Sequence, residues 1–160
     1  MNIEEGLSAR LDFLMMATKK ESEYLSQTDG RLFSGHLTIE NLQNIIADQT
    51  LAERREAFIG RFGRLQDMLD DKFLPALLTV LAEPKASALE NLDRAEKLGL
   101  IESTNKWLEI RKLRNQMVHE YIDDLEVLRD ALNTGHDFVT TLSATTDRMI
   151  ARWQKVSSQL

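Results

Sequence analysis

The chain has 160 residues, which fits one domain spanning 1–160 that is large enough to bury a sizeable core. Its 42% hydrophobic and 29% charged residues exclude wholesale disorder, and two prolines with seven glycines leave little material for the turns of an all-β fold. The absence of cysteine excludes disulfides and thiolate chemistry, and a net charge of −6 argues against a general nucleic-acid coat, so we expect no DNA partner.

The first residues, 1–5, are acidic and lack the basic and then apolar layout of a signal peptide. The longest strongly apolar stretch, residues 73–82, is far shorter than a membrane span. We therefore expect a cytoplasmic protein that does not enter a membrane.

Apolar residues that recur every three or four positions predict an amphipathic helix over residues 3–25. Residues 26–36 are rich in Ser, Thr, Asp and Gly, which predicts a loop. Thr38 is a candidate N-cap for a short helix that ends near Asp48.

The next helix is predicted to begin at residues 50–53, where Thr and Glu have the spacing of a capping box. An apolar stripe of Phe and Leu residues follows over 58–81. Pro75 lies inside this stripe, so we expect a kink there, because proline removes a backbone hydrogen bond. Pro84 marks the expected end.

Another helix is predicted over residues 86–97, with Gly99 as its C-cap. Ser103 or Thr104 then begins a helix that is expected to run to about Tyr121.

Residues 123–126 resemble a second capping box and open a long last helix that reaches about Val156. Gly135 lies within this helix, where it either allows a close helix crossing or breaks the helix, and the pattern does not decide between the two. No segment has a convincing strand pattern. Several long helices with short connections predict an all-α fold, an antiparallel helical bundle.

The helix that ends near Tyr121 carries the most informative pattern. With about 3.6 residues per turn, Arg114 falls in the middle of its apolar face. Burying an unpaired guanidinium costs several kcal/mol, so a carboxylate, a wet cleft between subunits or a phosphate must offset that cost. The apolar face is predicted to comprise Trp107, Ile110, Leu113, Met117, Val118 and Tyr121.

Hydrogen-bonding side chains gather beside Arg114 on the same helix. Asn115 and His119 are four residues apart and share a flank, and Tyr121 lies about two turns beyond Arg114. An imidazole can take the proton of an RNA 2′-hydroxyl at cellular pH, while a guanidinium can pair with two phosphoryl oxygens.

This arrangement predicts RNA cleavage without a metal or another cofactor. His119 is the expected general base, and Arg114 is expected to stabilise the phosphoryl transition state. Asn115 would hold His119 or a backbone turn, and Tyr121 would donate to phosphate or stack on a base. The local positive charge needed for RNA binding is predicted to come from Lys106, Arg111 and Lys112.

The segment from Arg114 to Tyr121 resembles the R-x4-H-x-Y signature of HEPN-domain proteins, and specifically looks like the HepT toxins. The resemblance covers about residues 105–132. It implies a helical bundle that forms a homodimer, with Arg114 and His119 of both subunits lining a shared cleft. It also implies metal-independent endoribonuclease activity and neutralisation by a nucleotidyltransferase antitoxin that attaches AMP to Tyr121.

Other interpretations remain open. Arg114 can be an interface ion-pair residue, His119 a helix cap and Tyr121 a core residue. The chain can then be the non-catalytic, substrate-binding subunit of a two-component nucleotidyltransferase, or a plain interaction dimer with a relic site.

The remaining titratable groups are expected to be structural. His36 and His136 are predicted to be solvated or structural, and no pair of histidines has metal-ligand spacing. Asp70 and Asp71 are interpreted as solvated or capping charges, although either of them is a conceivable partner of Arg114.

Overall fold

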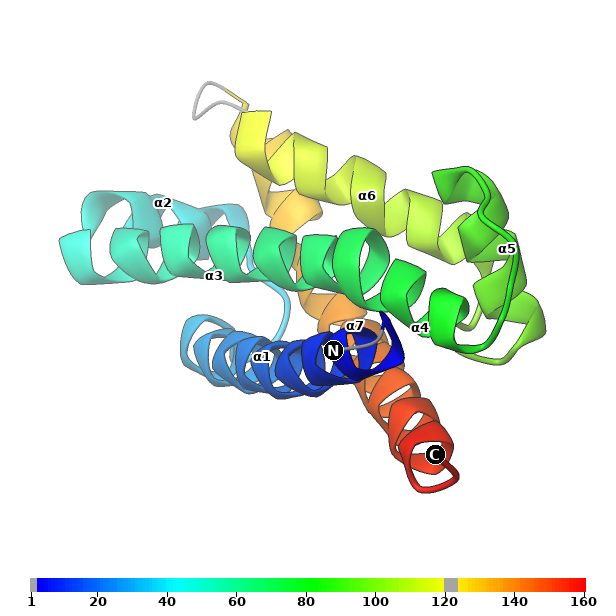
Figure 1. The fold of residues 1–160 in the computed structure, drawn as a ribbon. Helices are drawn as coiled ribbons and strands as arrows, with labels where there is room; N and C mark the ends of the chain where they lie inside the picture. Colours follow the sequence, from blue (N-terminus) through cyan, green and yellow to red (C-terminus); the bar gives the residue numbers. More distant parts are fainter. Residues whose placement is uncertain (1–2, 120–123) are drawn as a thin grey trace.

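The computed structural model describes residues 3–119 and 124–160, and every regular element in these two ranges is a helix. The predicted all-α class is therefore confirmed. The first helix, α1 (Ile3–Leu32), packs against α3 (Gln49–Asp67) and against the last helix, α7 (Leu125–Ser157). Figure 1 shows α1 on one side of α3 and the motif-bearing helix α6 (Thr104–His119) on the other side.

Helix α1 is two turns longer than predicted, because it includes residues 26–32 that the composition indicated as a loop. Leu25, Thr28 and Leu32 continue its buried face at helical spacing. Arg61 of α3 donates to the Thr28 hydroxyl and satisfies a polar group that would otherwise be buried unpaired. The loop prediction was wrong for these residues because packing against α3 overrides their composition.

The short helix α2 (Ile39–Ala47) begins as predicted. Thr38 Oγ1 accepts from the backbone N–H of Asn41 at 3.1 Å, and Asn41 Oδ1 accepts from the backbone N–H of Thr38 at 3.0 Å. Asp48, and not Thr50, caps α3, because Asp48 Oδ1 accepts from the backbone N–H of Leu51 at 2.9 Å.

The irregularity expected at Pro75 occurs in the turn that precedes it. A π-helical turn, η1 (Met68–Phe73), separates α3 from α4 (Leu74–Val80). The backbone N–H of Leu74 reaches back five residues to the carbonyl of Leu69. A wider turn at this place gives room to the proline ring, which would otherwise meet the carbonyl four residues earlier.

The next helix, α5 (Ala88–Lys97), is capped by Ser87 and followed by Gly99, whose φ of 74° confirms it as the left-handed residue after the helix. Ser103 begins α6, because its hydroxyl accepts from the backbone N–H of Lys106 at 3.2 Å. The helix ends at His119, so the expected extension to Tyr121 lies outside the described residues.

Helix α7 is continuous through Gly135, which resolves the open question in favour of a close crossing. A Cβ at Gly135 would lie 3.1 Å from Met117 Sδ of α6 and 3.3 Å from Phe58 Cε1 of α3. Asp124 caps the start of α7, with its Oδ1 accepting from the backbone N–H of Val127 at 3.2 Å. The cap lies inside the predicted segment 123–126, but one residue after Asp123, where the spacing of the predicted capping box begins.

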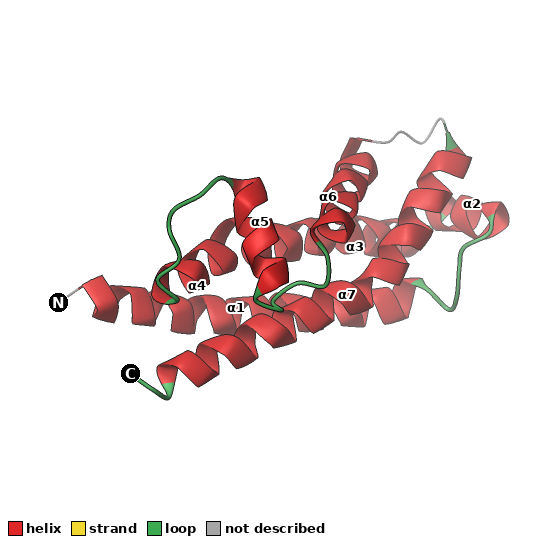
Figure 2. Cartoon of the chain, turned by 90° about the vertical axis from the view of Figure 1, so that its right-hand side faces the viewer, coloured by secondary structure: helices red, strands yellow, loops and turns green. Residues whose placement is uncertain are grey.

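The buried side chains of all helices form one hydrophobic cluster. The aromatic and leucine stripe of α3, η1 and α4 supplies its centre: Phe58, Phe62, Leu65, Leu69, Phe73 and Leu77 are each 0% exposed. Figure 2 shows α1 along the lower edge of the molecule with α5 and α6 above it, while α7 crosses diagonally from the level of α6 down to the C-terminus. In the part of the chain that the structure describes, no helix is both long and apolar enough to cross a bilayer.

Replacing Gly135 by valine should destabilise the fold by about 1–3 kcal/mol, because added carbons have no free space between Met117 and Phe58. Chemical denaturation measures this change. Gly60→Ala is the control, since the nearest atom to a Cβ there is the flexible end of Arg64 at 3.6 Å. That control should be neutral or stabilising by up to about 1 kcal/mol. Equal stability of Gly135→Val and wild type would contradict the close crossing.

Candidate functional site

Helix α6 presents four of the six predicted apolar residues to the core. Trp107, Ile110, Leu113 and Met117 are buried. Val118 is 52% exposed, so its assignment to the apolar face was wrong; one position beyond Met117 turns it by about 100° toward solvent. The sixth residue, Tyr121, lies outside the described residues.

Arg114 lies across α3 above a glycine. A Cβ at Gly63 would lie 3.0 Å from Arg114 Nε, so the absence of a side chain lets the guanidinium lie directly on the α3 backbone. One turn further along α3, Asp67 Oδ2 accepts from Arg114 Nη2 at 3.0 Å. Of the three expected ways to offset the cost of this arginine, a carboxylate is the one present, and it comes from Asp67 rather than from Asp70 or Asp71.

The Arg114–Asp67 ion pair is only partly sheltered from water. The two side chains are 35% and 38% exposed, so the pair contributes less than a buried one would. Arg114 Nε is buried without a hydrogen-bond partner in the described part of the chain. A ligand cannot reach this buried Nε, so a second acceptor, such as a phosphate oxygen, would have to bind the terminal guanidinium nitrogens on the exposed part of the side chain.

Asp70 is the most deeply buried charge beside the motif helix. Its side chain is 1% exposed, which corrects its interpretation as a solvated or capping group. Asp70 Oδ2 accepts from Gln66 Nε2 at 2.7 Å, from Trp107 Nε1 at 2.8 Å and from Arg111 Nε at 2.8 Å. The charge of Arg111, which was predicted to bind RNA, is thus already neutralised by a buried carboxylate.

The π-helical turn brings three carboxylates together. One oxygen from each of Asp67, Asp70 and Asp71 lies within 4.8 Å of the others. Carboxylate oxygens are suitable ligands for divalent metal ions. Here, however, the guanidinium groups of Arg114 and Arg111 already pair with Asp67 and Asp70. The arrangement is an ion-pair network of three acids and two arginines, which we call the α3–α6 network.

Burial raises the pKa of Asp71 above its ordinary value of 3.8, and the neighbouring charges of Asp70 and Asp67 raise it further. Arg111, whose Nη2 lies 3.9 Å from Asp71 Oδ1, acts in the opposite direction. The third carboxylate therefore ionises at a cost to the folded state.

Other predicted site residues differ in their surroundings. Asn115 is exposed, and Lys106 pairs with Glu102 at 3.2 Å. Lys112 is exposed and lines a groove of about 370 Å³ between α6 and α7, together with Gln116 and Asp130. The His119 side chain and all of Tyr121 lie outside the described residues, so the predicted convergence of Arg114, His119 and Tyr121 is not among the described geometry.

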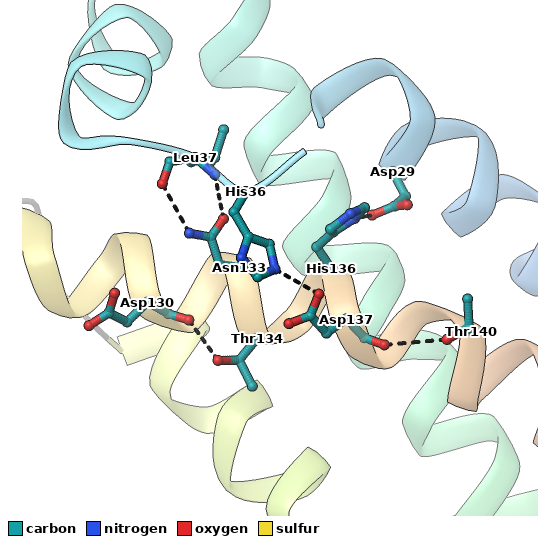
Figure 3. Close-up of polar contacts among 9 residues, drawn as sticks. All are labelled: Asp29, His36, Leu37, Asp130, Asn133, Thr134, His136, Asp137 and Thr140. Atoms are coloured by element: carbon teal, nitrogen blue, oxygen red, sulfur yellow. Dashed lines mark hydrogen bonds and ion pairs between the residues drawn. The ribbon is translucent and has the colours of Figure 1, made fainter. Parts of the chain in front are cut away.

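Two histidines lie near Gly135, away from the motif. His36 Nε2 contacts Asp137 Oδ1 at 2.8 Å, and His136 Nδ1 contacts Asp29 Oδ1 at 2.6 Å (Figure 3). The His136 ring also stacks on Phe33, with ring centroids 4.4 Å apart.

The loop between α1 and α2 is further tied to α7 by Asn133. Its side-chain amide accepts from the Leu37 N–H at 2.7 Å and donates to the Leu37 carbonyl at 3.0 Å (Figure 3). The two histidines therefore belong to contacts that hold this loop, as expected of structural groups.

Sequence reasoning missed two residues that shape the site, Gly63 and Asp67. The available signal was the spacing of Gly60, Gly63 and Asp67, which are three and four positions apart and so share one flank of α3. Small residues one turn before an acid leave room for the side chain of an arginine or lysine from a neighbouring helix. Comparison with known proteins found no matching family model, no matching curated protein and no matching solved structure.

Replacing Asp71 by asparagine should raise the melting temperature at pH 7, because the folded protein no longer bears a carboxylate that ionises at a cost. This loss of stability in the wild type disappears at a pH where the Asp71 carboxyl is protonated in both the folded and the unfolded protein. The difference from wild type should therefore shrink as the pH falls and vanish below about pH 3.8. Thermal unfolding over a pH series measures it.

The exposed Glu109 on the same helix face as Lys112 provides the matched control. Glu109→Gln removes one negative charge outside the α3–α6 network and should leave the pH dependence unchanged. If Asp71→Asn still raised the melting temperature at low pH, the ionised carboxylate of Asp71 could not be the cause of the difference.

Proposed function

We propose that this chain is a metal-independent endoribonuclease of the HEPN type, the toxin of a toxin–antitoxin pair. Arg114 is the observation that carries the proposal. Its side chain is held against α3 by Asp67 and by the absence of a side chain at Gly63, and 35% of its surface stays exposed to another acceptor. An RNA phosphate supplies such an acceptor.

The proposed reaction uses a general base and a fixed cation. His119 removes the proton of the 2′-hydroxyl, whose oxygen then attacks the adjacent phosphorus while the 5′-oxygen leaves. Arg114 stabilises the negative charge that develops on the phosphoryl oxygens. Asn115 and Tyr121 assist as hydrogen-bonding groups, and the exposed Lys112 supplies positive charge on α6. Lys106 would have to exchange its partner Glu102 for an RNA phosphate.

A homodimer that shares the cleft is part of this proposal. Val118 and Val127 precede and follow the segment 119–124, and they are 52% and 37% exposed. Apolar side chains at this end of α6 and α7 support a contact between subunits there. Such a contact would bring Arg114 and His119 of both subunits to one groove.

The alternative is a non-catalytic, substrate-binding subunit of a two-component nucleotidyltransferase. The observation that favours it is the compensation of positive charge in the α3–α6 network, where Arg111 faces a buried Asp70. A protein with a net charge of −6 and paired arginines attracts RNA weakly.

Purified protein is expected to cleave RNA in the presence of EDTA. His119→Ala should lower the cleavage rate by about 10²–10⁴-fold, because a general base is lost. His36→Ala is the matched control, since its exposed ring lies in the α1–α2 loop and should leave cleavage unchanged. A gel-based assay with circular dichroism of each variant measures activity and fold. Equal cleavage by wild type and His119→Ala would refute the nuclease and leave the alternative function.

Co-expression with a nucleotidyltransferase encoded beside this chain should attach AMP to Tyr121 and abolish cleavage, because a bulky anion would occupy the phosphate position beside Arg114. Intact-protein and peptide mass spectrometry locate the adduct, and Tyr121→Phe should escape modification. An inactivated complex that contains unmodified Tyr121 would contradict this mode of regulation.

A further inference from the structure

The outward face of α1 carries an unusual pair of exposed apolar side chains. Phe13 is 66% exposed and Met16 is 62% exposed, and among the large hydrophobic residues of the described ranges only the terminal Leu160 is more open. They lie three positions apart, so they are neighbours on the same helix face. Covering them with another apolar surface would remove them from water and favour a contact at this face.

A groove of about 340 Å³ lies beside this pair, between α1 and α7. It begins one turn after Phe13. Its walls are formed by Met15, Met16, Lys19, Lys20 and Glu23 of α1 and by Ile150 and Gln154 of α7. The same helix thus presents a protruding aromatic ring and, one to two turns further, a hollow with an apolar floor and charged rim.

We propose that a second copy of this chain covers this face, with the two α1 helices antiparallel and a twofold axis passing near Met16. In an isologous contact of this kind, each residue meets the one equally far from the axis on the other copy. Phe13 then lies opposite residue 19, at the rim of the groove in the second copy. Phe13 of each subunit thus meets the α1–α7 groove of the other subunit, so the same contact is made twice.

The charges beside the apolar pair obey the same symmetry. Asp12 lies opposite Lys20 of the second copy in this register. Asp12 Oδ1 accepts from Trp153 Nε1 at 2.9 Å, which holds the carboxylate in place. Its other oxygen and the exposed Lys20 have no ion-pair partner in the portion of the chain that the structure describes.

This contact is independent of the proposed nuclease site. Helix α1 and the end of α6 lie on different sides of the molecule in both Figure 1 and Figure 2. A chain that used both faces would build a tetramer if the two twofold axes were perpendicular and met at one point. The α1 contact alone would build a dimer.

Phe13→Asp tests the α1 contact through the mass of the assembly. The variant should halve the mass measured by light scattering on a size-exclusion column, while circular dichroism and the melting temperature stay unchanged. Leu89→Asp is the matched control, because Leu89 is 52% exposed on α5 and should leave the mass unchanged. A monomeric wild type, or a mass that Phe13→Asp does not change, would overturn the proposal.

A second measurement locates the twofold axis. The chain has no cysteine, so Met16→Cys introduces a single thiol. A short bis-maleimide should join two copies of this variant within minutes and far more completely than two copies of Leu89→Cys. Equal, slow cross-linking of the two variants would show that α1 does not face itself, and would assign the exposed pair to a different partner. Neither result depends on RNA cleavage, so failure here is distinct from failure of the nuclease.

Discussion

The position of the motif helix depends on one buried carboxylate. Asp70 is almost fully enclosed, and a charge in that place is tolerated only because Gln66, Trp107 and Arg111 donate to it. Two of these donors, Trp107 and Arg111, belong to α6. They reach Asp70 of η1 only when α6 has one position and one rotation about its axis. Loss of either donor would leave Asp70 Oδ2 short of hydrogen bonds, and among the described residues Asp70 Oδ1 already has no hydrogen-bond donor.

Close packing between helices also fixes the position of α6. Gly63 lets Arg114 rest on α3, and Gly135 lets α7 approach Met117 of α6 and Phe58 of α3. Protein interiors contain few voids, so α6 is packed between α3 at Gly63 and α7 at Gly135. The polar edge of α6 therefore faces water. The π-helical turn before Pro75 contributes as well, because it gathers Asp67, Asp70 and Asp71 opposite the arginines. The proposed site is thus supported by residues far from it in sequence.

Local pattern was sufficient for the elements whose signal is local. The cap at Thr38 and the αL residue at Gly99 were both predicted correctly, because a cap is decided by side chains within a few residues. The prediction failed where distant packing decides the outcome. Residues 26–32 are helical because they pack against α3, where Arg61 donates to the Thr28 hydroxyl. The cap of α3 was missed for a local reason, because Asp48 and Thr50 are both candidate caps and Asp48 is the one that accepts from the backbone N–H of Leu51.

What the sequence determined by itself is the helical class, most helix boundaries, the buried stripe of α3 to α4 and the presence of Arg114, Asn115 and His119 on one helix. Period and capping chemistry carry that information within the chain segment itself. Only the tertiary structure decided that Arg114 pairs with Asp67, that Arg111 is neutralised by Asp70, and that Gly135 serves a crossing. These outcomes depend on which side chains of separate helices come into contact when the helices pack, and the pattern within one helix does not contain that information.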